Sequence, residues 1–215
     1  MGKAPPVIHV AQTGPERAGR RAARVLDAGG LVVFPASGLY GLAADAQNPG
    51  AVDRVFAAKK RPADLSLLVL VGSMAQVDNL AAQVPQAARV LMEALWPGGV
   101  TLVLPAAPGV PEALTGGRGT IGVRLPAHPA ALAMVRALGR PVTGTSANVS
   151  GAPPCADPAL LDPDILGRAD LVLDADILSG KPSTVVDCTG GKPVVLRRGA
   201  VPESRIREIL EGMQP

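Results

Sequence analysis

The chain has 215 residues, of which 47% are hydrophobic and 18% charged, so a folded domain with a substantial core is expected rather than disorder. The net charge is +3, which permits binding to a polyanion without requiring it. Four residues in all are Phe, Trp or Tyr, too few for a base-stacking surface that binds single-stranded nucleic acid. Two cysteines and two histidines supply neither a disulfide framework nor a convincing zinc site, so no metal-ligating residues are expected.

No membrane anchor or export signal is expected. No apolar run, including the one at residues 67–71, approaches the roughly 20 residues needed to cross a bilayer. The first residues lack the apolar core of a signal peptide. We therefore expect a cytoplasmic protein with reduced cysteines and no contact with a membrane.

Helical and extended patterns alternate along the chain. The stretch from Thr13 to Glu16 matches a capping box, so a helix is expected to follow it and to end at Gly29-Gly30. Asn48-Pro49 is typical of the start of a second helix, which ends by Pro62. The remaining patterns predict strands at 31–35, 66–71, 100–104, 120–125, 141–144, 171–173, 184–187 and 194–196, and helices at 73–82, 86–95, 129–138, 157–167 and 202–212.

This interleaving indicates the α/β class, with a twisted, mostly buried mixed β-sheet flanked by helices. The sequence contains no internal repeat, low-complexity tract or linker. One domain over residues 1–215 is therefore expected, with a core at about 15–201 and a C-terminal helix at about 202–212.

Two common kinds of site are excluded. Gly144-Thr-Ser146 resembles a nucleophile elbow, but both histidines precede Ser146, so the chain order of an α/β-hydrolase triad is impossible. Gly180-Lys181 resembles the end of a phosphate-binding loop, but Pro182 interrupts it and a strand follows.

Four other segments place polar or cationic groups at strand ends. The first runs from Pro35 to Leu42 and carries Ser37 and Tyr40 among glycines that let the backbone approach a ligand closely. An ordinary turn would have the same composition.

The second segment is Lys59-Lys60-Arg61-Pro62. A residue before proline is displaced from helical geometry, so Lys59 and Arg61 could converge on one anion. A solvated cationic helix end, favoured by the helix dipole, is an equally good interpretation.

The third segment runs from Thr145 to Gly151. In an extended stretch Ser146 and Asn148 face the same way, and a hydroxyl beside a carboxamide suits phosphate oxygens or a metal-bound water. The alternative is a polar turn that ends the preceding strand.

The fourth segment combines two short strands, which would bring Ser183, Asp187 and Arg197 into one region. A surface hairpin with solvated arginines is the alternative. Arg124 adds a charge within an apolar strand, where either a salt bridge or a bound anion is expected.

Taken in order, these segments resemble the YrdC/Sua5 family of threonylcarbamoyl-AMP synthases over roughly residues 25–201. Each segment is weakly specific by itself, and the series of seven is much more so. The matching segments are Pro35 with Tyr40-Gly41-Leu42, Lys59-Lys60-Arg61-Pro62, Trp96-Pro97-Gly98 with Thr101-Leu102, Val123-Arg124-Leu125-Pro126, Ser146-Ala147-Asn148 with Ser150-Gly151, Ser183-Thr184-Val185-Val186-Asp187, and Leu196-Arg197 with Gly199.

The resemblance implies a single YrdC-like domain of the short type, with a concave cationic surface. It implies a nucleotidyltransferase that makes L-threonylcarbamoyl-AMP and pyrophosphate from L-threonine, bicarbonate and ATP, with Mg²⁺. A tRNA-modification transferase would then place the threonylcarbamoyl group on adenosine 37 of tRNA.

The resemblance also implies roles for residues. Lys59 and Arg61 would be catalytic, through charge neutralisation. The residues expected at ATP are Lys59, Arg61, Arg124, Ser146, Asn148 and Arg197. The residues expected at the amino acid are Ser37, Tyr40, Arg61 and Ser183.

The segment Ala36-Ser37-Gly38 departs from the family pattern, which usually has Thr, an acidic residue and Thr there. Ser37 is the one hydroxyl left in that stretch, so weaker binding of threonine is expected. A second departure is Ser66, where the family commonly has Pro.

Two alternatives follow. One is a YrdC-like paralogue with another carbamoyl donor or amino-acid substrate, suggested by the altered segment. The other is a non-enzymatic protein that binds double-stranded RNA or tRNA, suggested by the basic charge; weak RNA binding is also compatible with the enzyme.

Overall fold

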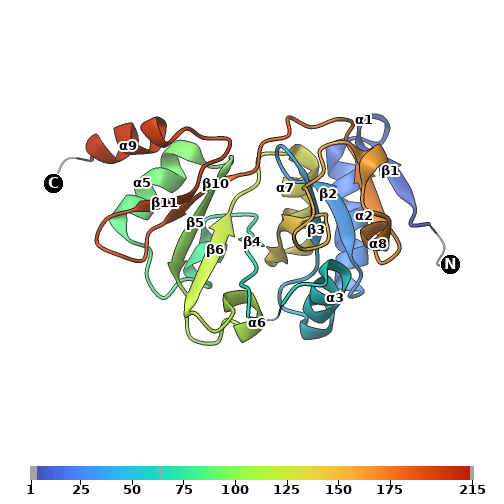
Figure 1. The fold of residues 1–215 in the computed structure, drawn as a ribbon, viewed down its shortest axis with the longest axis horizontal. Helices are drawn as coiled ribbons and strands as arrows, with labels where there is room; N and C mark the ends of the chain where they lie inside the picture. Colours follow the sequence, from blue (N-terminus) through green and yellow to red (C-terminus); the bar gives the residue numbers. More distant parts are fainter. Residues whose placement is uncertain (1–3, 63, 214–215) are drawn as a thin grey trace.

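Strands and helices interleave from the first described element to the last in a computed structural model that describes residues 4–62 and 64–213 (Figure 1). The strands are β1 (Val7–His9), β2 (Val32–Pro35), β3 (Tyr40–Ala43), β4 (Val69–Leu70), β5 (Val100–Pro105), β6 (Thr120–Arg124), β7 (Val142–Thr143), β8 (Thr145–Ser146), β9 (Leu171–Asp174), β10 (Thr184–Asp187) and β11 (Val194–Arg197). The helices are α1 (Val10–Thr13), α2 (Pro15–Asp27), α3 (Pro49–Lys59), α4 (Ala75–Asp78), α5 (Gln86–Leu95), α6 (Glu112–Thr115), α7 (Pro129–Leu138), the 3-10 turn η1 (Pro158–Leu160), α8 (Pro163–Leu166) and α9 (Glu203–Glu211).

The strands form two mixed sheets. One has the order β1-β9-β2-β3-β8, with β1, β9 and β2 parallel and β3 antiparallel to both β2 and β8. The other has the order β11-β10-β5-β6-β4-β7, in which β10 runs parallel to β5 and β4 runs parallel to β6. The mixed α/β class with flanking helices is confirmed, and its strands are shared between two sheets.

The division into two sheets occurs at the C-terminal end of the strand expected at 141–144. Val142 and Thr143 pair with β4 in the second sheet, whereas Thr145 and Ser146 pair with β3 in the first. Gly144 lies at the crossover, and a Cβ added there would come within 2.8 Å of side-chain atoms of Leu68 and Leu70. A residue without a side chain is therefore needed where the chain passes between the sheets.

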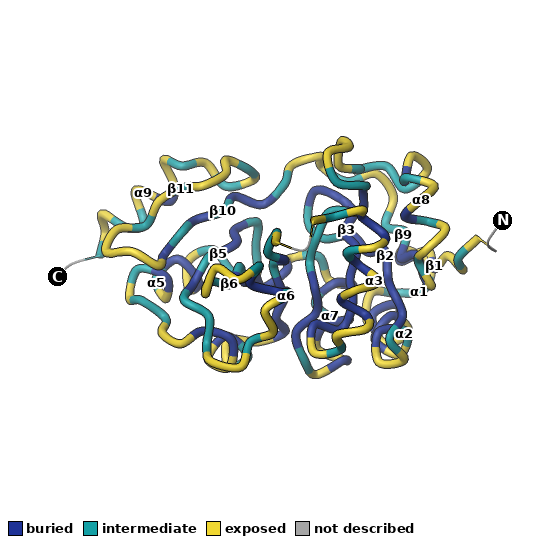
Figure 2. The backbone as a smooth tube through the Cα atoms, turned by 60° about the horizontal axis from the view of Figure 1, so that its bottom comes forward, coloured by how far each residue is buried: buried dark blue, intermediate teal, exposed yellow. Residues whose placement is uncertain are grey.

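Each sheet has its own helical cover (Figure 1). Helices α2 and α7 lie together against the first sheet, and α5 and α9 lie together against the second. The buried side chains concentrate in the strands and on the inner faces of these helices, while α9 and β11 form an exposed end of the molecule (Figure 2). The core thus supports the inner strand ends, where the polar segments lie.

Several local expectations are confirmed and others are corrected. Asn48 caps α3 by accepting a hydrogen bond from the backbone nitrogen of Ala51 at 3.2 Å. The capping-box prediction at Thr13 is wrong: Gly14 is the residue before α2, and no side chain caps that helix. Thr13 belongs instead to the short helix α1, so its geometry is helical rather than that of a cap.

The helices expected at 73–82 and 157–167 are shorter than predicted, because turns interrupt both stretches. Strands β1, β3 and β8 were not expected, since strands of two to four residues leave little periodic signal. In the described ranges, no helix combines the length and apolar character required to traverse a bilayer.

Candidate functional site

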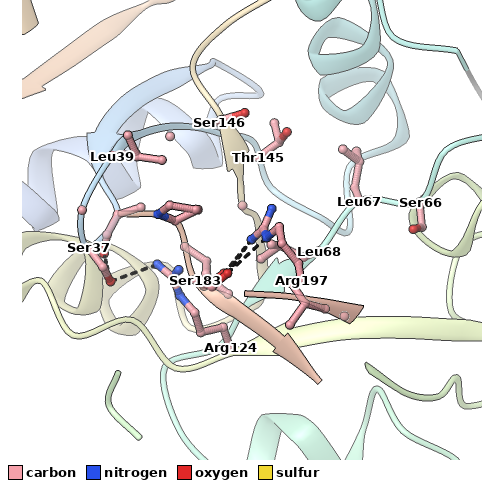
Figure 3. A pocket seen from close by; sticks show the side chains of 18 of the residues that line it. Ser37, Leu39, Ser66, Leu67, Leu68, Arg124, Thr145, Ser146, Ser183 and Arg197 are labelled. Carbon is pink, nitrogen blue, oxygen red and sulfur yellow. Dashed lines mark hydrogen bonds between the residues drawn. The ribbon is translucent and has the colours of Figure 1, made fainter. Parts of the chain in front are cut away.

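A cavity of about 310 Å³ lies where the two sheets meet, and both sheets contribute to its wall (Figure 3). The first sheet supplies residues of β2, β3, β8 and the turn between β2 and β3. The second supplies residues of β4, β5, β6, β10 and β11. The segments that the sequence marked as polar therefore converge because their strands end at one place.

The polar wall of the cavity is cationic. Arg61, Arg124, Lys181 and Arg197 line it, and none of the described residues that line it is acidic. Across the described ranges, none of the three arginines forms an ion pair with a carboxylate. A group of cations without a carboxylate partner is a site for an anionic ligand.

Two of these guanidinium groups have an unused donor in a buried position. The Nε atoms of Arg61 and Arg124 are buried and have no hydrogen-bond partner among the described residues. Arg61 otherwise donates through Nη2 to the Ser66 carbonyl at 2.8 Å, and Arg124 donates through Nη2 to Ser37 Oγ at 3.2 Å (Figure 3). Since buried donors are nearly always paired in folded proteins, these atoms indicate where ligand oxygens would bind.

The pKa values of all three arginines are lower than usual in this arrangement. Burial, together with a smaller effect of the nearby charge of Arg197, lowers the pKa of Arg124 to about 10. Burial also lowers the pKa of Arg61 and that of Arg197. A bound anion would oppose all three shifts, because it favours the charged form of each group.

Ser183 connects β10 with β11 and with the neighbouring strand β5. Arg197 donates through Nε and Nη2 to the Ser183 carbonyl, at 3.1 and 2.9 Å, and through Nη2 to Ser183 Oγ at 3.0 Å. The hydroxyls of Thr101 and Ser183 lie 2.9 Å apart. The fourth sequence segment is therefore an organised network rather than a solvated hairpin, although Asp187 does not line the cavity and caps a turn at Thr189 instead.

Lys59 lies behind the cavity wall and does not line it. Its side chain is 2% exposed, and its Nζ donates to the carbonyls of Ser146 and Asn148, the latter at 2.7 Å. The carbonyl of Lys59 in turn accepts from the backbone nitrogen of Ser150 at 2.8 Å. This residue thus holds the loop that presents Ser146 to the cavity, from both its side chain and its backbone.

Asn148 likewise does not line the cavity. Its amide nitrogen donates to the carbonyls of Val149 and Ala152, at 2.9 and 2.6 Å, which fixes the turn after β8. The segment from Thr145 to Gly151 therefore combines the two interpretations given for it, because Ser146 lines the cavity and Asn148 stabilises the turn.

Tyr40 lines the cavity, but its hydroxyl is already engaged. It donates to the Asp176 carbonyl and accepts from the backbone nitrogen of Ala175, both at 2.9 Å. Burial raises the pKa of the Tyr40 hydroxyl to about 12, so it stays protonated at neutral pH. The ring, rather than the hydroxyl, is what Tyr40 offers to a ligand.

Seven of the nine candidate residues surround one cavity, and two lie immediately behind it. Those that line the cavity are Ser37, Tyr40, Arg61, Arg124, Ser146, Ser183 and Arg197. Sequence reasoning missed Lys181, which follows the flexible-looking Gly180 and precedes Ser183 at the same strand end. Its position two residues before the candidate Ser183 was the available signal.

Comparison with known proteins gives consistent results. The Sua5/YciO/YrdC family model, which is described as "Telomere recombination", matches residues 24–199. Curated proteins named threonylcarbamoyl-AMP synthase, from Pyrococcus abyssi and Bacillus subtilis, are 40% and 36% identical over 192 residues each. These matches cover 89% and 88% of this chain and 56% of each relative, so the chain spans little more than half the length of these relatives.

A solved structure described as P. abyssi Sua5 complexed with L-threonine is also similar. It superposes with a TM-score of 0.86 at 39% sequence identity, covering 90% of this chain and 57% of the other. The fold that surrounds the cavity is therefore shared with a protein whose structure was determined with that amino acid.

Proposed function

We propose, since this chain belongs to the Sua5/YciO/YrdC family, that it is a transferase-type enzyme and specifically an L-threonylcarbamoyladenylate synthase. Its substrates would be L-threonine, bicarbonate and ATP, and its products L-threonylcarbamoyl-AMP and pyrophosphate. The observation that carries this proposal is the cavity lined by four cations and no described acidic residue. The names of the relatives from P. abyssi and B. subtilis support the same reaction.

The proposed chemistry brings like charges together. The amine of threonine and bicarbonate give a carbamate with loss of water, and a carbamate oxygen then attacks the α-phosphorus of ATP. The bond from that phosphorus to the bridging oxygen breaks, and pyrophosphate leaves with the electron pair. Carbamate, carboxylate and triphosphate all carry negative charge, so bringing them together in one cavity requires fixed positive charge.

The residues of the cavity meet that requirement. Arg61 and Arg197 would neutralise the phosphates, and the buried, unpartnered Nε of Arg124 would donate to a further oxygen. The rigid strands beneath them hold these groups in position before the substrates arrive, which lowers the reorganisation needed in the transition state. No nucleophile from the protein is required, which agrees with a chain order in which both histidines precede Ser146.

Mg²⁺ is part of the proposal only as a companion of ATP. Magnesium favours carboxylate, phosphate and water oxygens, and the described cavity wall has no carboxylate. In addition, the described residues contain no group of three His, Cys, Asp or Glu side chains suited to a metal. These residues do not fit a protein-held magnesium site, so no step is assigned to the ion.

The product is a mixed anhydride, which is prone to hydrolysis. A partner transferase would therefore have to accept it and transfer the threonylcarbamoyl group to adenosine 37 of tRNA. The chain would serve that modification as the enzyme that activates the threonylcarbamoyl group.

The proposal is tested by incubating the purified protein with ATP, Mg²⁺, labelled bicarbonate and L-threonine. Threonine-dependent release of pyrophosphate and labelled threonylcarbamoyl-AMP is expected. Arg61→Ala should raise the KM for ATP by about tenfold or more, because it removes a charge-assisted hydrogen bond to a phosphate. Arg207→Ala is the matched control, since Arg207 lies on α9 with an exposed side chain and does not line the cavity.

A folded wild-type protein without threonine-dependent pyrophosphate release would contradict the proposal. A panel of other amino acids and carbamoyl phosphate addresses the altered Ala36-Ser37-Gly38 segment. A clear preference for threonine and bicarbonate would remove the paralogue with different substrates.

A further inference from the structure

A buried hydroxyl beneath the cavity determines how Ser183 can bind a ligand. Thr101 lies on β5, is 1% exposed and does not line the cavity. Its hydroxyl has a single hydrogen-bond partner among the described residues, the Ser183 hydroxyl at 2.9 Å. A Cβ added at Gly122 on the neighbouring strand would lie 3.5 Å from the Thr101 methyl group, so that methyl faces β6 while the hydroxyl faces β10.

The direction of this hydrogen bond follows from counting donors and acceptors. A hydroxyl has one proton and two lone pairs, and a buried proton without an acceptor is strongly unfavourable. Since the Ser183 oxygen is the one acceptor available to Thr101 in the described structure, Thr101 is the donor. Arg197 donates to the same oxygen at 3.0 Å.

Both lone pairs of Ser183 are then occupied, which leaves its proton free. Ser183 lines the cavity, so that proton has the cavity as its remaining direction. Two donors acting on one oxygen also polarise the hydroxyl and strengthen the hydrogen bond that it gives. The Ser183 side chain therefore presents a donor, and no acceptor, to whatever binds beside it.

We propose that Thr101 is a positioning residue that makes the Ser183 hydroxyl a dedicated donor to the carboxylate of the amino-acid substrate. The inference rests on the proposed function for the identity of that substrate. Arg124, which also lines this part of the cavity, is likewise a donor without acceptor capacity. A carboxylate fits such a surface, whereas the substrate's amine must lie elsewhere, near the bicarbonate carbon that it attacks.

The test compares Thr101→Val, which keeps the shape and the methyl contact, with Thr101→Ser, which keeps the hydroxyl. Thr184→Val is the matched control. Thr184 is as buried as Thr101 and follows Ser183 directly in the sequence, but its hydroxyl forms hydrogen bonds with the backbone of Val201. Initial rates of pyrophosphate release give kcat and the KM for each substrate. L-threoninamide, which lacks the carboxylate but keeps the amine, is used as a second amino-acid substrate.

We expect Thr101→Val to raise the KM for L-threonine by about fivefold, with kcat and the KM for ATP changed by less than about twofold. Thr101→Ser and Thr184→Val should keep the wild-type KM for threonine. The preference of the wild type for threonine over threoninamide should shrink in Thr101→Val. A general loss of packing would instead lower kcat and affect both substrates.

Three results would overturn the inference while leaving the proposed function intact: an unchanged KM for threonine in Thr101→Val, failure of Thr101→Ser to behave as wild type, or equal use of threonine and threoninamide by the wild type. The last result needs no variant, so it would overturn the carboxylate assignment even where Thr101→Val does not fold. A wild type without threonine-dependent pyrophosphate release would overturn the proposed function, and the carboxylate assignment would fall with it.

Discussion

Lys59 and Arg61 are two residues apart, yet they have opposite surroundings. Helix α3 ends at Lys59, and Lys60 adopts a left-handed conformation with φ of 49°, which turns the chain before Arg61. Lys59 consequently points under the loop of Ser146, while Arg61 reaches the cavity. The catalytic role expected for Lys59 thus stays a prediction. The role that the structure supports is to hold the loop that carries Ser146.

The burial of Lys59 has a consequence for pH. Burial, together with a smaller effect of the charge of Arg61, lowers the pKa of Lys59 from its ordinary 10.5 to about 8. Between about pH 8 and 10.5 the unfolded chain holds this proton more often than the folded chain does. The contribution of Lys59 to folding stability therefore rises with pH across that window.

We expect this rise to be missing in Lys59→Met. The free energy of unfolding, measured with urea in the absence of nucleotide, should increase from pH 7.5 to 9.5 by roughly 2 kcal/mol more in wild type than in the variant. The variant also loses the donor to the carbonyls of Ser146 and Asn148, so the comparison uses the change with pH. Parallel curves for the two proteins would mean that Lys59 titrates normally.

The contact between α2 and α7 shows how closely packed elements support the first sheet. Gly19 lies on α2 where a Cβ would come within 2.6 Å of the Cβ of Ala133 and of the backbone nitrogen of Met134. Glycine is unfavourable within a helix, yet here its small size permits the two helices to approach. Close packing outweighs helix propensity at this position.

Gly19→Ala is therefore expected to destabilise the protein by about 1–3 kcal/mol, because the two helices must move apart. Gly50→Ala is the matched control in α3, since its nearest neighbour would be Asn48 Oδ1 at 3.5 Å, an ordinary contact. That substitution should be neutral or stabilise by up to about 1 kcal/mol. Urea unfolding of both variants measures the difference, and a stable Gly19→Ala protein would disprove the close packing.

At the scale of the whole molecule, the cavity depends on both sheets being in place. Arg61, Ser37 and Ser146 reach it from segments associated with the first sheet and its helices, whereas Arg124 and Arg197 reach it from the second. Local sequence patterns do not predict that these strands meet at one cavity. Crossing at Gly144 joins the two sheets at the cavity wall.

A ligand that contacts both sheets should bind the folded chain and not the unfolded one, because only folding brings the two sheets together. Such a ligand should therefore stabilise the folded state by mass action. ATP at about 100 times its Kd is expected to add about 2.7 kcal/mol to the free energy of unfolding. Arg197→Ala should lose most of this gain at the same ATP concentration, because one cation of the cavity is removed. Urea unfolding with and without ATP measures both, and an equal gain in the variant would place ATP outside this cavity.

The sequence by itself determined the α/β class and several elements to the residue, including α5, α7 and β10, because apolar periodicity and Pro or Gly boundaries are local signals. It also marked seven side chains that line the cavity. Only the tertiary structure decided the division into two sheets at Gly144, the burial of Lys59 and Asn148 behind the wall, and the network of Thr101, Ser183 and Arg197. Those features depend on contacts between residues far apart in the chain, and local patterns carry no information on which distant groups will share a hydrogen bond.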